Sequence, residues 1–126
     1  MIAAMDVGLK RIGLAISPDS KVVLPQDAVL RQNRNQAANA VDAFLQTWQV
    51  HTLIVGVPKG GSSEAEMTRR IEHFVGLLDF DGKVCYQDEY GSSQEAAEMM
   101  RGITRQKRDG KLDSLAAKLI LQRWIG

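Results

Sequence analysis

The sequence has little of several features that mark particular protein classes. Its 126 residues include one cysteine, Cys85, so a disulfide within the chain and a cysteine-rich zinc site are both excluded. It contains no run of about 18 apolar residues, and a transmembrane helix is therefore not expected. Neither charge predominates, because 16 basic residues stand against 15 acidic ones. Any affinity for nucleic acid must therefore come from a local patch of cations.

What is present is the composition of an ordinary globular domain. The chain is 44% hydrophobic and 25% charged, and its length suits one domain spanning residues 1–126, since domains typically have about 100–200 residues. The N-terminus carries no signal-peptide pattern, because a short apolar run meets Asp6 almost at once. A lone cysteine also fits a reducing compartment. We expect a cytoplasmic protein with a single domain and no membrane partner.

The first part of the chain predicts strands. Residues 1–5 and 11–17 are apolar runs joined by a glycine-marked turn. Residues 22–30 form a third candidate strand, which Pro25 restricts to the edge of a sheet. We therefore expect a three-strand antiparallel meander.

The rest of the chain alternates helices and strands. Apolar residues recur every three or four positions in residues 37–48, which predicts a helix, and "HTLIVGV" (51–57) is typical of a parallel strand buried on both faces. The remaining elements are expected as helices at 62–78, from Ser92 or Ser93 to residue 100, and at 112–125, with a strand at 83–87. The predicted fold class is α/β: a five-stranded mixed sheet, made of the antiparallel meander and two parallel strands, with helices on both faces. Residues 1–5 are expected at its centre.

Three segments bring polar groups to one edge of this sheet. Asp6, residues 56–63 and the pair Asp88-Glu89 all follow the carboxyl ends of strands, where sites in open α/β sheets lie. Asp113 falls within the apolar stripe of the last predicted helix, where a carboxylate is costly unless a cation or hydrogen bonds meet it. Each acid also has a plainer interpretation. Asp6 is alternatively a turn residue and Asp113 an N-cap or first-turn residue, while the Asp-Glu pair suits a solvated loop.

Together, the acids suggest metal chemistry. Mg²⁺ prefers oxygen ligands and is often bound by one or two carboxylates together with substrate phosphates. Two such ions can activate a water and stabilise the leaving oxygen in phosphodiester cleavage. An acid on a central strand, another at a neighbouring strand end and a third on a helix against the sheet meet this need. We therefore predict Asp6, Glu89 and Asp113 as catalytic metal ligands for Mg²⁺ or Mn²⁺.

Cations lie close to these acids in the sequence. Lys10 and Arg11 follow Asp6, and the segment 101–111 has five cations against one acid. Because affinity for a nucleic-acid backbone is largely electrostatic, we predict contacts with nucleic acid at Lys10, Arg11, Lys59, Arg101, Arg105, Lys107, Arg108 and Lys111. A solvated charged loop is the alternative at 101–111. "PKGGSSE" (58–64) is either a phosphate-binding loop before a helix N-terminus or a plain connector.

Four segments resemble, in the same order, the successive motifs of the YqgF family. They are "MDVGLKRIGLAIS", "LIVGVPKGGSSE", "QDEYGSSQEA" and "GKLDSLAAKLILQRWI", and they cover nearly the whole chain. Members of this family are described as Holliday junction resolvases or pre-16S rRNA processing nucleases with a ribonuclease H-like fold. By position, the resemblance implies that Asp6, Glu89 and Asp113 form the acidic triad. The other matching positions are Gly8, Lys10, Arg11 and Gly13 in the first motif, and Gly56 and Pro58 in the second.

The chain departs from the family pattern in three places. Tyr90 stands where an Arg usually follows the Asp-Glu pair, and Ser92-Ser93 stand where Thr-Thr is common. The loop at 59–63 is shorter than the Asn-Met-Asp-Gly-like loop of the family. Replacement of the Arg removes a partner for phosphate or carboxylate, while the triad itself is intact.

The sequence leaves three classes of function open. The first is a metal-dependent nuclease for structured nucleic acid, with the 5′ end of pre-16S rRNA as the expected substrate and a Holliday junction in branched DNA as the alternative. The second is a nucleic-acid-binding protein without catalysis. The third is an actin-like ATP-binding protein, because "DVGLKRIGLAI" also resembles the first phosphate motif of that superfamily. Such proteins pair two similar domains, however, and this chain has the length for one. A junction resolvase calls for a homodimer, whereas an RNA-processing enzyme can be a monomer.

The histidines and tryptophans have structural interpretations. His51 and His73 lack metal-ligand spacing and are expected at a strand edge and on a helix surface. Trp48 and Trp124 fall on apolar helical faces. Both tryptophans are therefore expected in the core.

Overall fold

The chain forms one mixed sheet of five strands with helices on both faces. The computed structural model describes residues 1–8, 10–57, 64–88 and 114–126. The strands are β1 (Ile2–Val7), β2 (Arg11–Ser17), β3 (Leu24–Leu30), β4 (Thr52–Val57) and β5 (Lys83–Asp88). Their order is β3-β2-β1-β4-β5, with antiparallel pairing in β1–β2 and β2–β3 and parallel pairing in β1–β4 and β4–β5. The predicted sheet is confirmed, including the central place of the first strand and the edge place of the strand that contains Pro25.

The first strand is longer than its apolar run. β1 continues to Val7 because Asp6 pairs with Gly13, and Val7 with Ile12, in the β1–β2 ladder. Asp6 therefore lies inside the strand, one residue before its end, and its alternative interpretation as a turn residue is wrong. A residue within a ladder has its side chain on a defined face of the sheet. This position gives Asp6 a fixed direction.

The structure describes three helices, α1 (Arg34–Thr47), α2 (Glu64–Gly76) and α4 (Leu115–Ile125). α1 begins earlier than its apolar spacing predicts because the side chain of Asn33 accepts a hydrogen bond from the N–H of Gln36 and caps the helix. Ser114 is the N-cap residue of α4. The helix expected in residues 92–100 lies outside the described residues.

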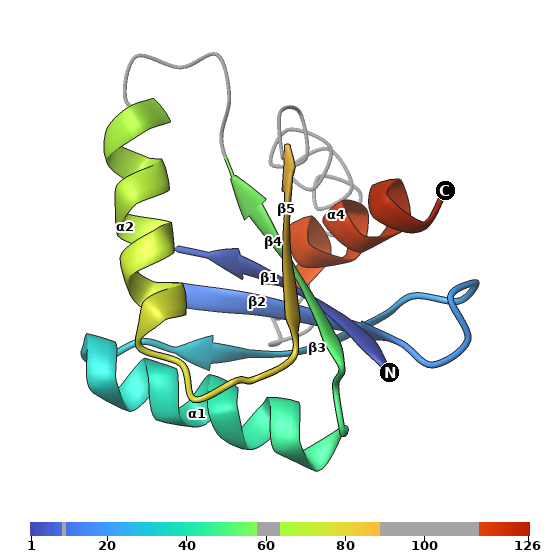
Figure 1. The fold of residues 1–126 in the computed structure, drawn as a ribbon, viewed down its shortest axis with the longest axis horizontal. Coiled ribbons are helices and arrows are strands. Elements are labelled where there is room, and N and C mark those ends of the chain that lie inside the picture. The colour runs from blue at the N-terminus through green and yellow to red at the C-terminus, as the bar shows by residue number, and fades with distance from the viewer. Residues whose placement is uncertain (9, 58–63, 89–113) are drawn as a thin grey trace, which may run out of the picture.

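α1 and α2 cover one face of the sheet (Figure 1). Large apolar side chains from the strands and from both helices fill this layer, because residues that alternate along each strand present them to the same side. Fully buried members are Met5, Ile12, Leu14, Ile16, Val41, Leu53, Val55, Ile71 and Phe74. This layer is the larger part of the core.

α4 covers the opposite face (Figure 1). This layer is smaller within the described residues, and three of its buried members are alanines. The buried members are Ile2, Ala4, Ala15, Val23, Ile54, Ala117, Ile120 and Leu121. Small side chains at a contact allow helix and strands to lie close together.

The two tryptophans depart from their expected place in the core. Trp48 is the C-cap residue of α1, and Trp124 lies near the end of α4. Their side chains are 39% and 38% exposed, because the end of a helix leaves part of a large ring uncovered. Both rings are therefore more exposed than the expected place in the core implies.

The described helices were also compared with the dimensions of a bilayer. A helix that crosses a membrane needs about 20 mainly apolar residues. None of the three described helices is long and apolar enough to do so.

Candidate active site at the carboxyl edge of the sheet

Asp6 is the member of the predicted triad that the structure describes. Side chains alternate along β1: Met5 and Val7 belong to the core under α1 and α2, whereas Ala4 belongs to the core under α4. Asp6 therefore presents its carboxylate on the α4 face, near the carboxyl end of the central strand. The residue is partly buried.

Glycines flank Asp6 on both neighbouring strands. Gly13 of β2 is its direct partner in the antiparallel ladder. In the parallel ladder Met5 pairs with Val55, so Gly56 of β4 lies beside Asp6 one position further along. Because glycine has no side chain, β2 and β4 leave the sheet surface bare on either side of the carboxylate. An ion or a phosphate can approach such a surface closely.

The turn between β1 and β2 brings two cations to the same edge. The N–H of Gly8 donates to the carbonyl of Arg11 at 2.9 Å, and a Cβ at Gly8 would lie 2.5 Å from that oxygen, so this close turn requires glycine. The N–H of Arg31 donates to the carbonyl of Lys10, also at 2.9 Å, which ties the turn to the residue after β3. The side chains of Lys10 and Arg11 are exposed, as the prediction of phosphate contacts requires.

The described C-terminal segment begins next to the strand that pairs with Asp6. The hydroxyl of Ser114, which is 0% exposed, accepts a hydrogen bond of 3.0 Å from the N–H of Leu14. The β2–β3 ladder shifts its register between Ile12 and Leu14, and Ser114 provides the partner that a buried N–H needs at this irregularity. Leu14 directly follows Gly13, the partner of Asp6. The chain thus returns at Ser114 to within one residue of the position opposite Asp6.

The parallel ladder brings the end of β5 level with Asp6. Gly56 pairs with Gln87, and Val57 with Asp88. Cys85, two residues before Gln87, packs against the core under α4, so alternation places Gln87 on the same face as Asp6.

The remaining predicted site residues lie outside the described residues. They are Glu89, Asp113, Lys59, Arg101, Arg105, Lys107, Arg108 and Lys111, together with Tyr90 and the shortened loop at 59–63. Among the residues that the structure describes, no three His, Cys, Asp or Glu side chains come together as a metal site. A carboxylate between two bare strand positions suits the preference of Mg²⁺ and Mn²⁺ for oxygen ligands. Asp6 therefore fits the role of one ligand to such an ion.

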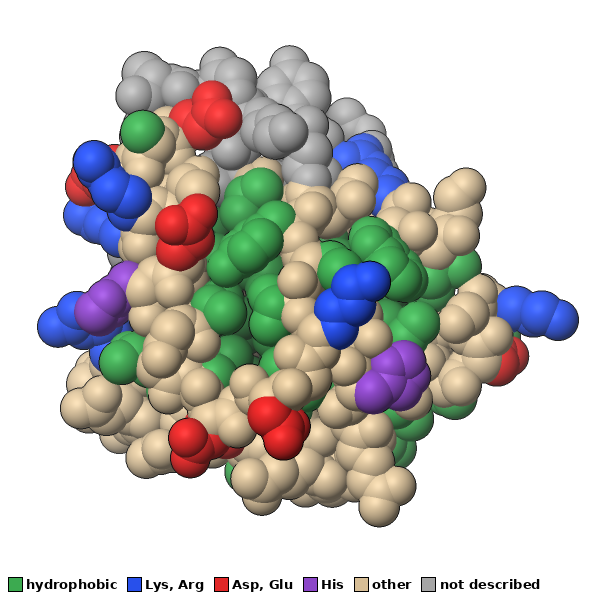
Figure 2. Space-filling view, viewed as in Figure 1, with side chains coloured by type: hydrophobic (Ala, Val, Ile, Leu, Met, Phe, Trp, Pro, Cys, Tyr) green, Lys and Arg blue, Asp and Glu red, His purple; other side chains and the backbone are tan. Residues whose placement is uncertain are grey.

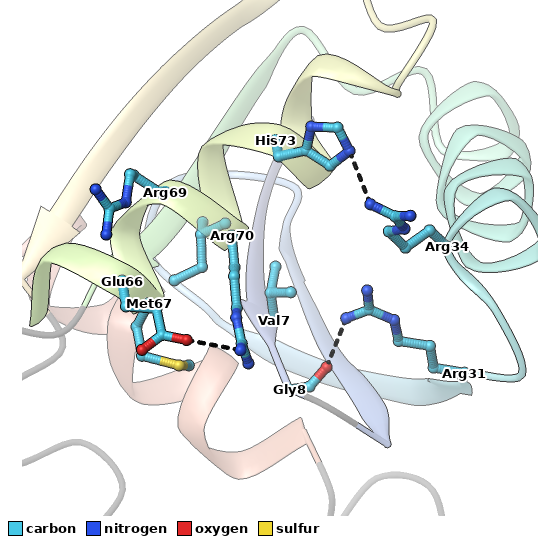
Figure 3. A pocket seen from close by; sticks show the side chains of 10 residues that line it. Val7, Gly8, Arg31, Arg34, Glu66, Met67, Arg69, Arg70 and His73 are labelled. Atoms are coloured by element: carbon cyan, nitrogen blue, oxygen red, sulfur yellow. Dashed lines mark hydrogen bonds and ion pairs between the residues drawn. The ribbon is translucent and has the colours of Figure 1, made fainter. Parts of the chain in front are cut away.

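Sequence reasoning missed a second group of polar residues, on the other face of the same edge. They line a cavity of about 420 Å³ beside the end of β1 (Figure 3). The lining residues are Val7, Gly8, Arg31, Arg34, Glu66, Met67, Arg69, Arg70, Ile71 and His73. The arginines come from two separate segments of the chain, so no local run of charge indicates their convergence.

The sheet order and the helices on its two faces define a ribonuclease H-like fold. Thermus thermophilus RuvC, solved with a Holliday junction substrate, superimposes with a TM-score of 0.58 at 16% identity, covering 98% of this chain and 92% of RuvC. The Fowlpox virus resolvase, solved with Holliday junction DNA, superimposes with a TM-score of 0.57 at 16% identity, covering 98% and 95% of the two chains. The predicted fold class is confirmed.

The chain belongs to the RuvX family, described as Holliday junction resolvase, whose sequence model matches residues 1–126. A Sulfurovum protein is 62% identical over 124 residues, covering 98% of this chain and 97% of its own. A protein of Campylobacter jejuni subsp. doylei is 58% identical over 122 residues, covering 97% and 94%. Both relatives carry the name "Putative pre-16S rRNA nuclease". RuvX is another name for the YqgF family, so the resemblance found in the sequence is confirmed.

Proposed function

We propose that this chain is a divalent-metal-dependent nuclease that cleaves phosphodiester bonds in structured nucleic acid, with precursor 16S rRNA as its substrate. The observation that carries the proposal is the carboxylate of Asp6, held on the α4 face between Gly13 and Gly56 in a chain of the RuvX family. We further propose that residues 1–126 act as one domain, in the cytoplasm, a compartment that suits a chain with a single cysteine.

Asp6, Glu89 and Asp113 form the acidic set in this proposal. Glu89 comes two residues after Gln87, so continued alternation along β5 would give it the face that Asp6 occupies. Asp113 directly precedes Ser114, whose hydroxyl accepts a hydrogen bond from the strand that pairs with Asp6. The positions of Gln87 and Ser114 thus support the convergence of the three acids at one point of the sheet edge.

These acids would hold Mg²⁺ or Mn²⁺, which when bound activates a water and stabilises the leaving oxygen. Asp6 contributes a carboxylate oxygen, and Gly13 and Gly56 leave room beside it for the phosphate to be cleaved. Lys10 and Arg11 attract neighbouring phosphates by charge. Further backbone contacts are proposed at Lys59, Arg101, Arg105, Lys107, Arg108 and Lys111.

Ribosomal RNA is favoured as the substrate because the relatives at 62% and 58% identity carry the name "Putative pre-16S rRNA nuclease". A four-way DNA junction is the second candidate, supported by the description of the family and by the two resolvases that share the fold. Paired cuts across a junction call for a two-fold dimer, whereas a monomer suffices to process an RNA end. The oligomeric state in solution therefore helps to distinguish the two substrates.

The test is the variant Asp6→Asn, which keeps the size of the side chain but removes the charge that holds an ion. Cleavage of precursor rRNA and of a four-way DNA junction is followed side by side in Mn²⁺. We expect cleavage of the preferred substrate to fall about 100-fold or more, since even the indirect partners of metal ligands typically contribute about 10- to 100-fold. Nucleic-acid binding measured in EDTA should persist. Added Mn²⁺ should raise the Tm of the wild type more than that of the variant, because the ion binds only the folded site.

Asp27→Asn is the matched control, because Asp27 is exposed on the edge strand β3 and carries the same charge. It should cleave as the wild type does. Equal cleavage by Asp6→Asn and wild type would contradict the proposal. If the wild type binds nucleic acid but cleaves neither substrate in Mn²⁺, the nucleic-acid-binding function without catalysis is favoured instead.

A further inference from the structure

The cavity beside the end of β1 combines a positively charged rim with an apolar wall. Its cations are four arginines and its one acid is Glu66. The apolar part of the lining comes from Val7, Met67 and Ile71. The rim faces the side of the molecule where α2 lies, and Lys and Arg side chains gather there next to a histidine (Figure 2).

Arg31 is held in place by neutral groups. Its Nη1 donates to the carbonyl of Gly8 at 3.1 Å, and its guanidinium lies 5.4 Å from the centre of the Phe74 ring, a distance at which a cation is attracted by the face of the ring. Neither partner carries a charge. These contacts fix the guanidinium without neutralising it, and Figure 3 shows the one to Gly8.

Arg34 and Arg70 approach the cavity from the two helices. Nη1 of Arg34 lies 3.2 Å from Nε2 of His73, and because a guanidinium only donates, Nε2 is the acceptor in this contact. Arg70 is paired with Glu66 at 2.7 Å, with both side chains more than half exposed. Such an exposed pair contributes little to stability, so an incoming anion can replace it. Arginine suits phosphate in particular because its planar fork binds two oxygens at once.

The size of the cavity limits what can enter. Its volume of about 420 Å³ falls at the lower end of small-molecule sites, which span about 300–1,000 Å³. A nucleic-acid duplex is far too wide for it. One nucleotide has the required chemistry, with a phosphate for the arginines and a flat, largely apolar base for the wall.

We propose that this cavity binds a single unpaired nucleotide, with its phosphate on Arg31, Arg34 and Arg70 and its base against Met67 and Ile71. The nucleotide is either one unit of a single-stranded segment of the substrate or a free nucleotide. Asp6 and Val7 are consecutive residues on opposite faces of β1, so a strand that passes over the Gly8 turn can reach both the carboxylate and the cavity. The inference rests on the proposed function in one respect, that the substrate is a nucleic acid.

The test compares two variants that remove the same charge from opposite edges of the sheet. Arg34→Gln/Arg70→Gln removes two cations from the cavity. Lys21→Gln/Lys83→Gln removes two exposed cations at the other edge, where Ser17 pairs with Ile2 and Thr52 with Lys83. Binding of a short unstructured RNA, of a blunt RNA duplex and of AMP is measured by fluorescence anisotropy or competition in EDTA, where no cleavage occurs.

The cavity variant should bind the unstructured RNA about tenfold more weakly, which corresponds to about 1.4 kcal/mol. Its log–log salt slope should fall by about 0.7 for each phosphate that the protein no longer binds. The control variant should bind the unstructured RNA as the wild type does, and binding of the duplex should change little in either variant. If AMP competes with the unstructured RNA, the cavity is a site for a free nucleotide. If AMP does not compete but the cavity variant loses binding of the unstructured RNA, the cavity is a site for one unit of a strand. Equal losses for duplex and single strand, or no loss, would overturn the inference.

A second pair of variants keeps the arginines intact. Met67→Glu adds a carboxylate to the cavity and should weaken binding of the unstructured RNA, whereas Met67→Leu preserves volume and should not. Melting temperatures show that each variant is folded. The nucleotide site and the nuclease site can be refuted separately. Retained cleavage by Asp6→Asn refutes the nuclease site alone. Unchanged RNA binding by Arg34→Gln/Arg70→Gln and by Met67→Glu refutes the nucleotide site alone.

Discussion

The two faces of the sheet differ in what they bury. Under α1 and α2 the interior is filled by large side chains such as Met5, Leu53 and Phe74. Under α4 the described layer is smaller, and alanines such as Ala4 and Ala117 lie there beside Ile120 and Leu121. Among the described residues the first face therefore buries more apolar side chains, and burial of apolar surface is the main favourable term in folding.

The polar groups are distributed in the opposite way. The buried polar residues of the described chain are Ser17, Thr52 and Ser114. Ser17 and Thr52 both pair with Ile2, which places them on the α4 face, and Ser114 stands at the N-cap position of α4. Asp6 lies on the same face. One face thus holds the larger apolar layer, while the other combines a smaller apolar layer with polar groups in fixed places.

The largest effect is expected on the apolar face. Phe74→Ala removes a ring that is 1% exposed and should lower the free energy of unfolding by about 3–5 kcal/mol, because it leaves a cavity as well as losing buried surface. Chemical denaturation measures the change. Leu77→Ala, at an exposed position after α2, is the control and should cost about 0.5 kcal/mol or less. A similar small cost at Phe74 would contradict the division of roles between the faces.

The α4 face should instead be sensitive to added volume. Ala117→Leu places a larger side chain where helix and sheet meet without space, and should lower the free energy of unfolding by about 1–3 kcal/mol. Gln122→Leu adds a similar side chain at an exposed position of the same helix and should have little effect. If Ala117→Leu stabilises the chain, the alanines leave a void and the close contact is refuted.

Two serines on the α4 face should respond differently to the same change. Ser114→Ala leaves the buried N–H of Leu14 without its partner and should cost about 1–3 kcal/mol. Ser17→Ala removes a buried hydroxyl oxygen that has no partner within the described residues, so stability should stay the same or rise. Denaturation of the two variants in parallel checks the contrast. Equal losses would mean that burial alone, and not hydrogen bonding, sets the cost.

Sequence patterns predicted the sheet because its strands have strong local signals. The continuous run at 51–57 and the proline of the third strand both correspond to their observed places. The end of β1 was not predictable from apolarity, since Asp6 belongs to the strand only through its pairing with Gly13. Asn33 did carry a usable signal for the start of α1, because asparagine is a favoured N-cap.

The candidate site was predictable only where its residues carry a motif. Asp6 and the two following cations stand in one short segment, and their shared edge follows from the strand that contains the acid. The arginine cavity has no such segment, because Arg34 and His73 lie 39 positions apart and meet only when α1 and α2 pack on the same face. Glu89 and Asp113 remain sequence-based predictions.

The hydrogen bond between Leu14 and Ser114 joins residues that are 100 positions apart. Synthesis runs from the N-terminus, so the five strands are made before α4, which covers the second face of the sheet. Until α4 leaves the ribosome, Ala4, Ala15 and Ile54 lack the cover that this helix gives them. On the proposed function, a partly translated copy has no assembled site. The order of synthesis would thus keep such a nuclease inactive until α4 has left the ribosome.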